Sequence, residues 1–233
     1  MVSPASGKEL IFVADPMCSW CWGFAPTISA IRRDFGKVLD ISLVVGGLRP
    51  GTTDVMSTAM KSDIRHHWEH VYEASGQPFD FDFFRRDDFV YDTEPACRAI
   101  VSVRELKPDA ALDFLATLHQ SFYAENKDIT NSDILAGLAG EAGLDVDQFR
   151  QYFISEKAKK KTVNDFQYAH GLGVTGFPTI VARDGAVARP ETGNPQANDL
   201  AESQYAYLTV GYRPYQALEP LLREWVGQAT APA

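Results

Sequence analysis

The stretch DPMCSWCWGF, residues 15–24, holds two cysteines, Cys18 and Cys21, that are separated by two residues. It directly follows ELIFVAD (9–15), a short run rich in Ile, Phe and Val that predicts a buried strand. The next segment, residues 25–36, carries apolar side chains at helical spacing. The cysteine pair is therefore expected where a strand turns into a helix.

The rest of the chain predicts an α/β fold that is interrupted by helices. A second strand is predicted over residues 38–47, which completes a β-α-β unit with a parallel strand pair. Almost everything from about residue 53 to 171 has helical character. Strand character then returns. Two strands are predicted over residues 176–187 and 203–212, with a loop between them at residues 188–199, and a terminal helix follows over residues 215–227.

Composition limits the classes of partner. The 233-residue chain has a formal net charge of −9, whereas a nucleic-acid-binding surface normally produces a basic excess. No apolar run approaches the roughly 20 residues that span a bilayer, and the first residues do not resemble a signal peptide. We therefore expect no nucleic-acid or membrane partner and a cytoplasmic location. Three cysteines are also too few for a disulfide-stapled secreted scaffold.

The position of the cysteine pair favours redox chemistry. Backbone N–H groups and the helix dipole meet at a helix start and stabilise an anion there, which lowers the pKa of a thiol. We expect Cys18 to be this exposed, acidified thiol, which attacks a disulfide as its thiolate. Cys21 lies one turn further into the helix, where it is expected to be more buried and to displace the bound partner from Cys18.

Two other interpretations of the pair are less well supported. A zinc site needs four ligands, usually as two spaced pairs, and Cys97 and the histidines do not form a second pair at matching spacing. An inert structural disulfide between Cys18 and Cys21 would close only a very small loop and would constrain the unfolded chain little.

The neighbours of the pair suggest how a substrate is held. Trp20 lies between the cysteines and Trp22 follows them, and we assign both to an apolar substrate-binding surface, with packing as the alternative. Phe24 is assigned to packing. For Asp15, a polar group that ends the strand is preferred over a charge that raises the thiol pKa or relays a proton.

These residues resemble the DsbA-like thioredoxin-fold disulfide oxidoreductases, in particular their signal-less, FrnE-like branch. The resemblance rests on DPMCSWCWGF after a strand, a long helical block, and GVTGFPTIV before a later strand. It implies that Pro178 is cis and that the loop with Phe177 faces the cysteines and pairs with an extended substrate. It also implies a discontinuous thioredoxin-like domain (residues 8–52 and 172–229) and a helical insertion domain (residues 53–171).

The resemblance implies a thiol–disulfide oxidoreductase, acting as oxidase, reductase or isomerase through Cys18 and Cys21. No bound cofactor is expected, because the cysteine pair is itself the redox centre. Thiol- or disulfide-containing proteins are the expected substrates, with glutathione as a further candidate. Two alternatives stay open: a glutathione-linked transferase or isomerase of the kappa type, and a non-catalytic protein-binding adaptor on the same fold.

Four further residues have side chains with potential chemistry. Cys97 lies near a predicted helix start and is interpreted as a small buried residue, with a third redox thiol as the alternative. His66 and His70 share one helix face at metal-ligand spacing, but an ordinary helix surface is preferred. His170 precedes the GVTGFPTIV motif and is a weaker candidate for proton transfer.

Overall fold

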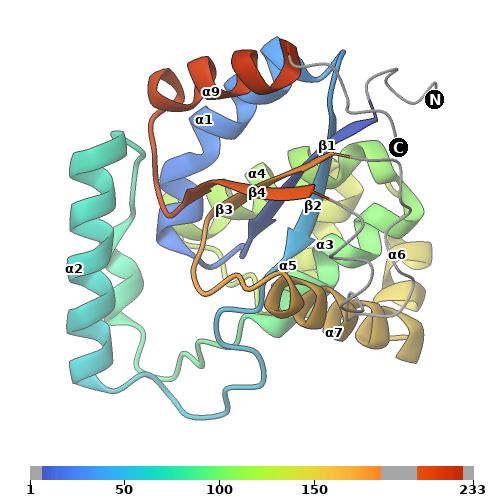
Figure 1. Ribbon diagram of the computed structural model, residues 1–233. Coiled ribbons are helices and arrows are strands. Elements are labelled where there is room, and N and C mark those ends of the chain that lie inside the picture. The colour runs from blue at the N-terminus through green and yellow to red at the C-terminus, as the bar shows by residue number, and fades with distance from the viewer. Residues whose placement is uncertain (1–6, 185–203, 228–233) are drawn as a thin grey trace.

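A four-stranded mixed sheet forms the centre of the computed structural model, which describes residues 7–184 and 204–227 (Figure 1). The strand order across the sheet is β2-β1-β3-β4. β1 and β2 are parallel, and β3 is antiparallel to both of its neighbours, β1 and β4. The strands are β1 (Lys8–Ala14), β2 (Asp40–Val45), β3 (Thr179–Asp184) and β4 (Gln204–Val210).

Alternating side chains of β1 supply both faces of the sheet. Leu10 and Phe12 belong to a buried cluster with residues of α1 (Ser19–Phe35) and α9 (Tyr215–Gly227), which lie together in Figure 1. Ile11 and Val13 point the other way, into a second buried cluster with residues near the end of α7. Because successive strand side chains alternate in direction, a run of apolar residues indicates a strand covered on both faces.

The segment between β2 and β3 is almost entirely helical. Its α-helices are α2 (Thr58–Ser75), α3 (Glu94–Leu106), α4 (Ala111–His119), α5 (Ser132–Glu141), α6 (Val146–Phe153) and α7 (Glu156–Gly171). Shorter 3-10 turns occur at Phe81–Arg85 and Pro108–Ala110, and a π-helical turn at Gln120–Ala124 continues α4. Figure 1 shows α2 to one side of the sheet, away from α3, α6 and α7.

Local sequence signals explain several helix ends. The side chains of Ser57, Asn131, Asp145 and Ser155 each accept a hydrogen bond from a backbone N–H of the first turn that follows. Such caps satisfy donors that have no partner inside the helix. Helix α2 ends at Gly76, which adopts a left-handed conformation with φ of 72° that favours glycine.

The aromatic-rich segment that follows α2 packs around one tryptophan. Trp68 of α2 is fully buried, and the rings that surround it include Phe79, Phe83 and Phe84, with centroids 4.8–5.1 Å away. Offset and edge-on ring pairs of this kind add to the stability that burial itself provides. The cluster therefore covers the helical core.

A buried ion pair ties the helical segment to the sheet. Arg104 of α3 donates two hydrogen bonds to Asp165 of α7, at 2.7 and 2.9 Å, and a third to the Leu43 carbonyl at 2.8 Å. Asp165 in turn accepts the Val45 backbone N–H at 3.0 Å. One bidentate pair thus fixes two helices to β2, as the planar guanidinium favours.

The fold predicted from the sequence is confirmed: it is an α/β thioredoxin-like fold with a large helical insertion. Helix α1 begins at Ser19 with Cys18 as its cap, as expected from the position of the cysteine pair, and it ends at Phe35, directly before Gly36. The predicted strand 176–187 begins only at Thr179. Residues 185–187 and the predicted loop 188–199 lie outside the described residues.

The division into two domains stays a prediction. The largest buried cluster contains residues of β1 and α1 as well as residues of α3 and α4. Within the described part of the chain, no helix is both long enough and apolar enough to cross a bilayer.

Candidate active site

Cys18 ends the short turn between β1 and α1 and directly precedes the helix. It caps the helix with φ −91° and ψ 113°, and its carbonyl accepts the backbone N–H of Cys21 at 2.9 Å and of Trp22 at 3.1 Å. Its side chain makes no capping hydrogen bond, so the sulfur is not bound to the first turn of the helix. Cys18 is more buried than the sequence suggested, since the residue is only 6% exposed.

The loop from Gly176 to Thr179, which is distant in the sequence, lies next to the Cys18 sulfur. The Cys18 thiol donates to the Phe177 carbonyl at 3.6 Å, across 159 residues of sequence. The Phe177–Pro178 peptide bond is cis. The Phe177 ring packs against Gly46, where an added Cβ would come 2.0 Å from a ring atom. The structure therefore brings Phe177 and Pro178 to Cys18.

Cys21 lies one turn into α1 and is fully buried. Burial is the main cause that raises its pKa well above the usual range, and its hydrogen bond to Cys18 and the charges of Cys18 and Asp15 raise the pKa further. The Cys21 thiol therefore keeps its proton until a reaction step removes it. The two cysteines also differ in position: Cys18 caps α1 and faces the Phe177 carbonyl, whereas Cys21 lies inside the helix.

Asp15 holds the turn that carries both cysteines. Its carboxylate accepts the backbone N–H groups of Met17 at 2.8 Å and Leu48 at 2.7 Å, and also the thiol of Cys97 at 3.3 Å. Asp15 is fully buried, and this burial raises the pKa of its carboxyl. The residue acts as the predicted polar group at the strand end, but it also places a titratable group beside the cysteines.

Cys97 is fully buried in the first turns of α3, which agrees with the preferred interpretation of a small buried residue. Burial raises its pKa well above the usual range, and the nearby charge of Asp15 adds to this effect. Its thiol is a hydrogen-bond donor to Asp15, so it belongs to the support of the cysteine turn.

The two tryptophans of the motif point in different directions. Trp20 is half-buried and packs against Tyr212, with ring centroids 5.7 Å apart. Trp22 is buried: it donates to the Pro78 carbonyl at 3.0 Å and stacks on Tyr123 at 6.3 Å. Trp20 therefore stays at the surface of the site, whereas Trp22 joins the motif to the helical insertion. Phe24 is buried and packs against Phe12 of β1, as assigned.

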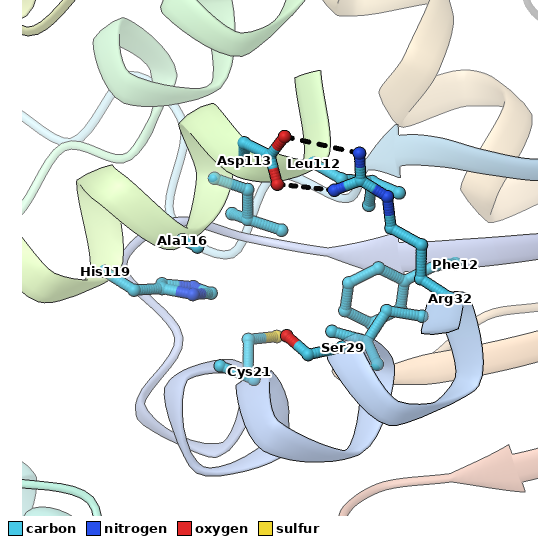
Figure 2. Close-up of a pocket in the computed structure, with 11 residues that line it drawn as sticks. Phe12, Cys21, Ser29, Arg32, Leu112, Asp113, Ala116 and His119 are labelled. Carbon is cyan, nitrogen blue, oxygen red and sulfur yellow. Dashed lines mark hydrogen bonds and ion pairs between the residues drawn. The ribbon is translucent and has the colours of Figure 1, made fainter. Parts of the chain in front are cut away.

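His119 is a residue of the site that no sequence signal selected. It lies at the end of α4, is 1% exposed, and places Nε2 3.3 Å from the Asp15 carbonyl oxygen. Burial lowers the pKa of its imidazole to about 4, so the ring is neutral at physiological pH. Figure 2 shows its ring entering a cavity that Cys21 also lines.

The other histidines lie apart from this arrangement. The rings of His66 and His70 contact each other on α2, with centroids 4.1 Å apart, and His66 is mostly exposed. No group of three or more His, Cys, Asp or Glu side chains is arranged to hold a metal ion among the described residues. His170 is exposed in the last turn of α7, the helix on the sheet face away from α1.

Comparison with known proteins agrees with this geometry. A family model described as thioredoxin matches residues 11–194, which include both cysteines and the Phe177–Pro178 loop. The chain belongs to this thioredoxin family. Among solved structures, a candidate protein disulfide isomerase from Nitrosomonas europaea is 35% identical, with a TM-score of 0.81 over 94% of this chain and 97% of that one.

More distant thioredoxin-fold relatives carry different names. The cytosolic disulfide reductase DsbM from Pseudomonas aeruginosa has a TM-score of 0.70 at 22% identity, over 93% of this chain and 98% of that one, and shows the shared fold. The ClpXP adapter protein SpxH of Halalkalibacterium halodurans is 26% identical over 94% of this chain and 68% of its own length. The chain spans only 58% of the Bacillus subtilis SpxH, at 23% identity over 76% of this chain.

Proposed function

We propose that this thioredoxin-family chain is a thiol–disulfide oxidoreductase that works through Cys18 and Cys21. The observation that carries the proposal is the placement of the Cys18 sulfur, at the start of α1 and 3.6 Å from the Phe177 carbonyl, with Cys21 one turn behind it. The similarity to the candidate disulfide isomerase from Nitrosomonas europaea supports it.

The reaction proceeds in two thiol–disulfide exchanges. In the reducing direction, the Cys18 thiolate attacks one sulfur of a substrate disulfide, a Cys18–substrate disulfide forms, and the other substrate sulfur leaves as a thiolate. Cys21 then loses its proton and attacks the Cys18 sulfur, which releases the second substrate thiolate and leaves a Cys18–Cys21 disulfide. Two enzyme thiols are oxidised and one substrate disulfide is reduced. The reverse sequence oxidises a substrate.

Substrates are thiol- or disulfide-containing proteins that bind in extended form along the cis-proline loop. The Phe177 backbone pairs with the substrate main chain, while Pro178 and the half-buried Trp20 contact its side chains. Trp22 is buried and supports the site from behind instead of touching the substrate. We place this activity in the cytoplasm, the compartment named for DsbM.

A disulfide turnover assay tests the proposal. The wild-type protein is expected to reduce insulin in the presence of a small thiol, and Cys18→Ser is expected to abolish this turnover. Cys97→Ser is the matched control, because it changes a cysteine that takes no part in the exchange and keeps a donor toward Asp15. A wild-type protein without turnover contradicts the proposal.

The direction of electron flow follows from the reduction potential of the pair. A potential of about −270 mV makes the pair a reductant like thioredoxin, and one of about −120 mV makes it an oxidant like DsbA. Equilibration with glutathione redox buffers, read by the fraction of Cys18–Cys21 disulfide, gives this value.

Two specific observations keep other functions in view. The curated relatives named ClpXP adapter protein favour partner binding, which would survive a Cys18→Ser, Cys21→Ser double change in a binding assay with ClpXP. A structure of DsbM with GSH favours glutathione as a ligand. Saturable glutathione binding, with activity that survives Cys21→Ser, would support a glutathione-linked transferase or isomerase instead.

A further inference from the structure

A cavity between α1 and α4 is lined by Cys21 but not by residues of the cis-proline loop. Cys21 and His119 line its buried end, whereas Ser29, Arg32 and Asp113 line the end at which residues are exposed. Figure 2 shows the Arg32–Asp113 ion pair across this outer end. The cavity volume of about 40 Å³ exceeds the roughly 10–15 Å³ that one water needs.

His119 lines this cavity, and its hydrogen bonding leaves one ring nitrogen without a partner. A backbone carbonyl only accepts hydrogen bonds, so Nε2, which faces the Asp15 carbonyl at 3.3 Å, carries the ring proton. Nδ1 therefore holds a lone pair. It is buried and has no hydrogen-bond partner among the described residues. An unsatisfied buried acceptor costs about 1–3 kcal/mol, which a water in the cavity would offset.

Cys21 needs a route by which its proton can leave. Its thiol is fully buried, and its proton must be removed before it attacks the Cys18 sulfur. The carboxylate of Asp15 is nearby, but its two oxygens already accept hydrogen bonds from Met17, Leu48 and Cys97. The cavity offers a second path from Cys21 to solvent. Apolar residues such as Phe12, Ile28 and Leu115 form much of its wall, and Ser29, Arg32, Asp113 and His119 supply the polar groups.

We propose that this cavity is a water-filled proton route to Cys21, and that His119 is the positioning residue that anchors its innermost water through Nδ1. The proposal rests on the thiol–disulfide exchange proposed above. It concerns the resolving step only, because the cavity lies behind Cys21 and does not include Cys18.

The proton balance of the step is simple. In the mixed disulfide, Cys21 passes its proton to the anchored water as its sulfur bonds to the Cys18 sulfur. The bond between Cys18 and the substrate breaks, and the substrate leaves as a thiolate. The proton moves outward along the cavity past Ser29 to solvent. In the oxidising direction, the same path returns a proton to the Cys21 sulfur.

The groups around His119 keep it in the form that this role needs. Trp22 and Tyr123 face its ring at centroid distances of 6.0 and 6.2 Å, and burial raises the pKa of the Tyr123 hydroxyl well above its usual range. On its Nε2 side the ring faces the backbone carbonyl of Asp15. At the outer end of the cavity, Arg32 and Asp113 form an ion pair, so their charges offset each other. The imidazole therefore stays a neutral hydrogen-bond acceptor at physiological pH.

A coloured aromatic disulfide, dithiobis-nitrobenzoate, separates the two exchanges in stopped flow. Attack by Cys18 releases the first coloured thiolate, and attack by Cys21 on the resulting mixed disulfide releases the second. His119→Ala is expected to slow the second phase by about tenfold or more and to leave the first phase unchanged. An unaltered second phase overturns the proton route, whereas absence of the first phase in the wild type overturns the proposed function.

Chemical rescue distinguishes an acceptor from a space-filling ring. Imidazole added to His119→Ala is expected to restore the second phase, and pyrrole, which has the same ring size but no free nitrogen lone pair, is not. Equal rescue by both molecules contradicts the role of Nδ1. Where His119→Ala does not fold, His119→Gln replaces it: its amide oxygen accepts a hydrogen bond, so its second phase is expected to stay faster than that of His119→Leu.

Blocking the route from the surface provides an independent check. Ser29→Leu fills the outer part of the cavity and is expected to slow the second phase. Ala30→Leu adds a side chain to the neighbouring position of α1, which does not line the cavity, and is expected to leave it unchanged. Equal rates for the two variants contradict the path.

Discussion

His119 and Asp15 are buried side by side at the cysteine turn, and burial moves their pKa values in opposite directions. The pKa of His119 falls to about 4, so between this value and its ordinary 6.5 the unfolded state binds more protons than the folded state. The contribution of His119 to the unfolding free energy is therefore fully present above pH 6.5 and is lost as the pH falls toward 4. The pKa of Asp15 is raised instead, so its contribution decreases as pH rises from about 3.8.

The pH dependence of unfolding isolates the effect of His119. Between pH 7 and pH 5 the wild type is expected to lose about 2 kcal/mol more of its unfolding free energy than His119→Gln does. Asp15 is present in both proteins and cancels in the comparison. Urea unfolding at the two pH values measures the difference, and parallel losses in the two proteins would show that His119 is not held neutral.

The sequence alone selected the two candidate cysteines but not the residues that surround them. Cys18 and Cys21 were found from their spacing and from the strand before them, because both signals are local. His119 was missed because its role depends on packing between α4 and a turn 104 residues earlier. For Trp22 the sequence left both substrate binding and packing open, since an apolar residue beside a motif does not show in which direction it points.

Among the elements, the turn after β2 decides how closely the cis-proline loop approaches. Gly46→Ala would place a Cβ 2.0–2.8 Å from atoms of the Phe177 ring, which must then move. We expect a stability loss of about 1–3 kcal/mol and a larger fractional loss of insulin reduction, because the Phe177 carbonyl faces Cys18. Turnover and thermal unfolding measure the two effects.

Gly137 provides the matched control for this change. It lies inside α5, and an added Cβ there meets nothing within 4 Å. Gly137→Ala is expected to keep full turnover and to stabilise the helix by roughly 0.5–1 kcal/mol. If Gly46→Ala behaves like Gly137→Ala, the Phe177 ring does not depend on the glycine.

The ion pair between α3 and α7 is expected to matter more than an exposed pair. Arg104→Leu leaves the carboxylate of Asp165, whose side chain is 6% exposed, without its guanidinium, at an expected cost of about 3–5 kcal/mol. Arg150→Leu breaks a pair with Asp133, whose side chains are 46% and 76% exposed, and is expected to cost under about 1 kcal/mol. Similar urea midpoints for both variants would contradict this ranking.

Element boundaries followed the sequence where one pattern covers the whole element. The predicted helix over residues 215–227 coincides with α9, because its apolar side chains repeat at helical spacing throughout. Within the stretch of helical character from about residue 53 to 171, the part that begins at Pro108 forms a 3-10 turn, α4 and a π-helical turn, which the sequence pattern did not distinguish. In that π-helical turn Ser121, Phe122 and Tyr123 are all buried, and tertiary packing rather than local spacing accounts for it.

One buried cluster runs from the sheet into the helical insertion. It joins Phe12 of β1 to Phe114 of α4, and Trp22 of α1 contacts Tyr123 across the same boundary. We therefore expect the chain to unfold in a single cooperative transition. Far-ultraviolet circular dichroism and tryptophan fluorescence should give coincident urea curves, whereas separate transitions would show that insertion and sheet are independent.

The trapped mixed disulfide of a Cys21→Ser variant tests the central claim most directly. With Cys21 removed, Cys18 still attacks a substrate disulfide, but nothing expels the bound half. Mass spectrometry after incubation with oxidised glutathione or an oxidised peptide is expected to show one adduct per chain, located on the peptide that contains Cys18. An adduct on Cys97, or no adduct while the wild type turns over disulfides, would contradict Cys18 as the attacking thiol.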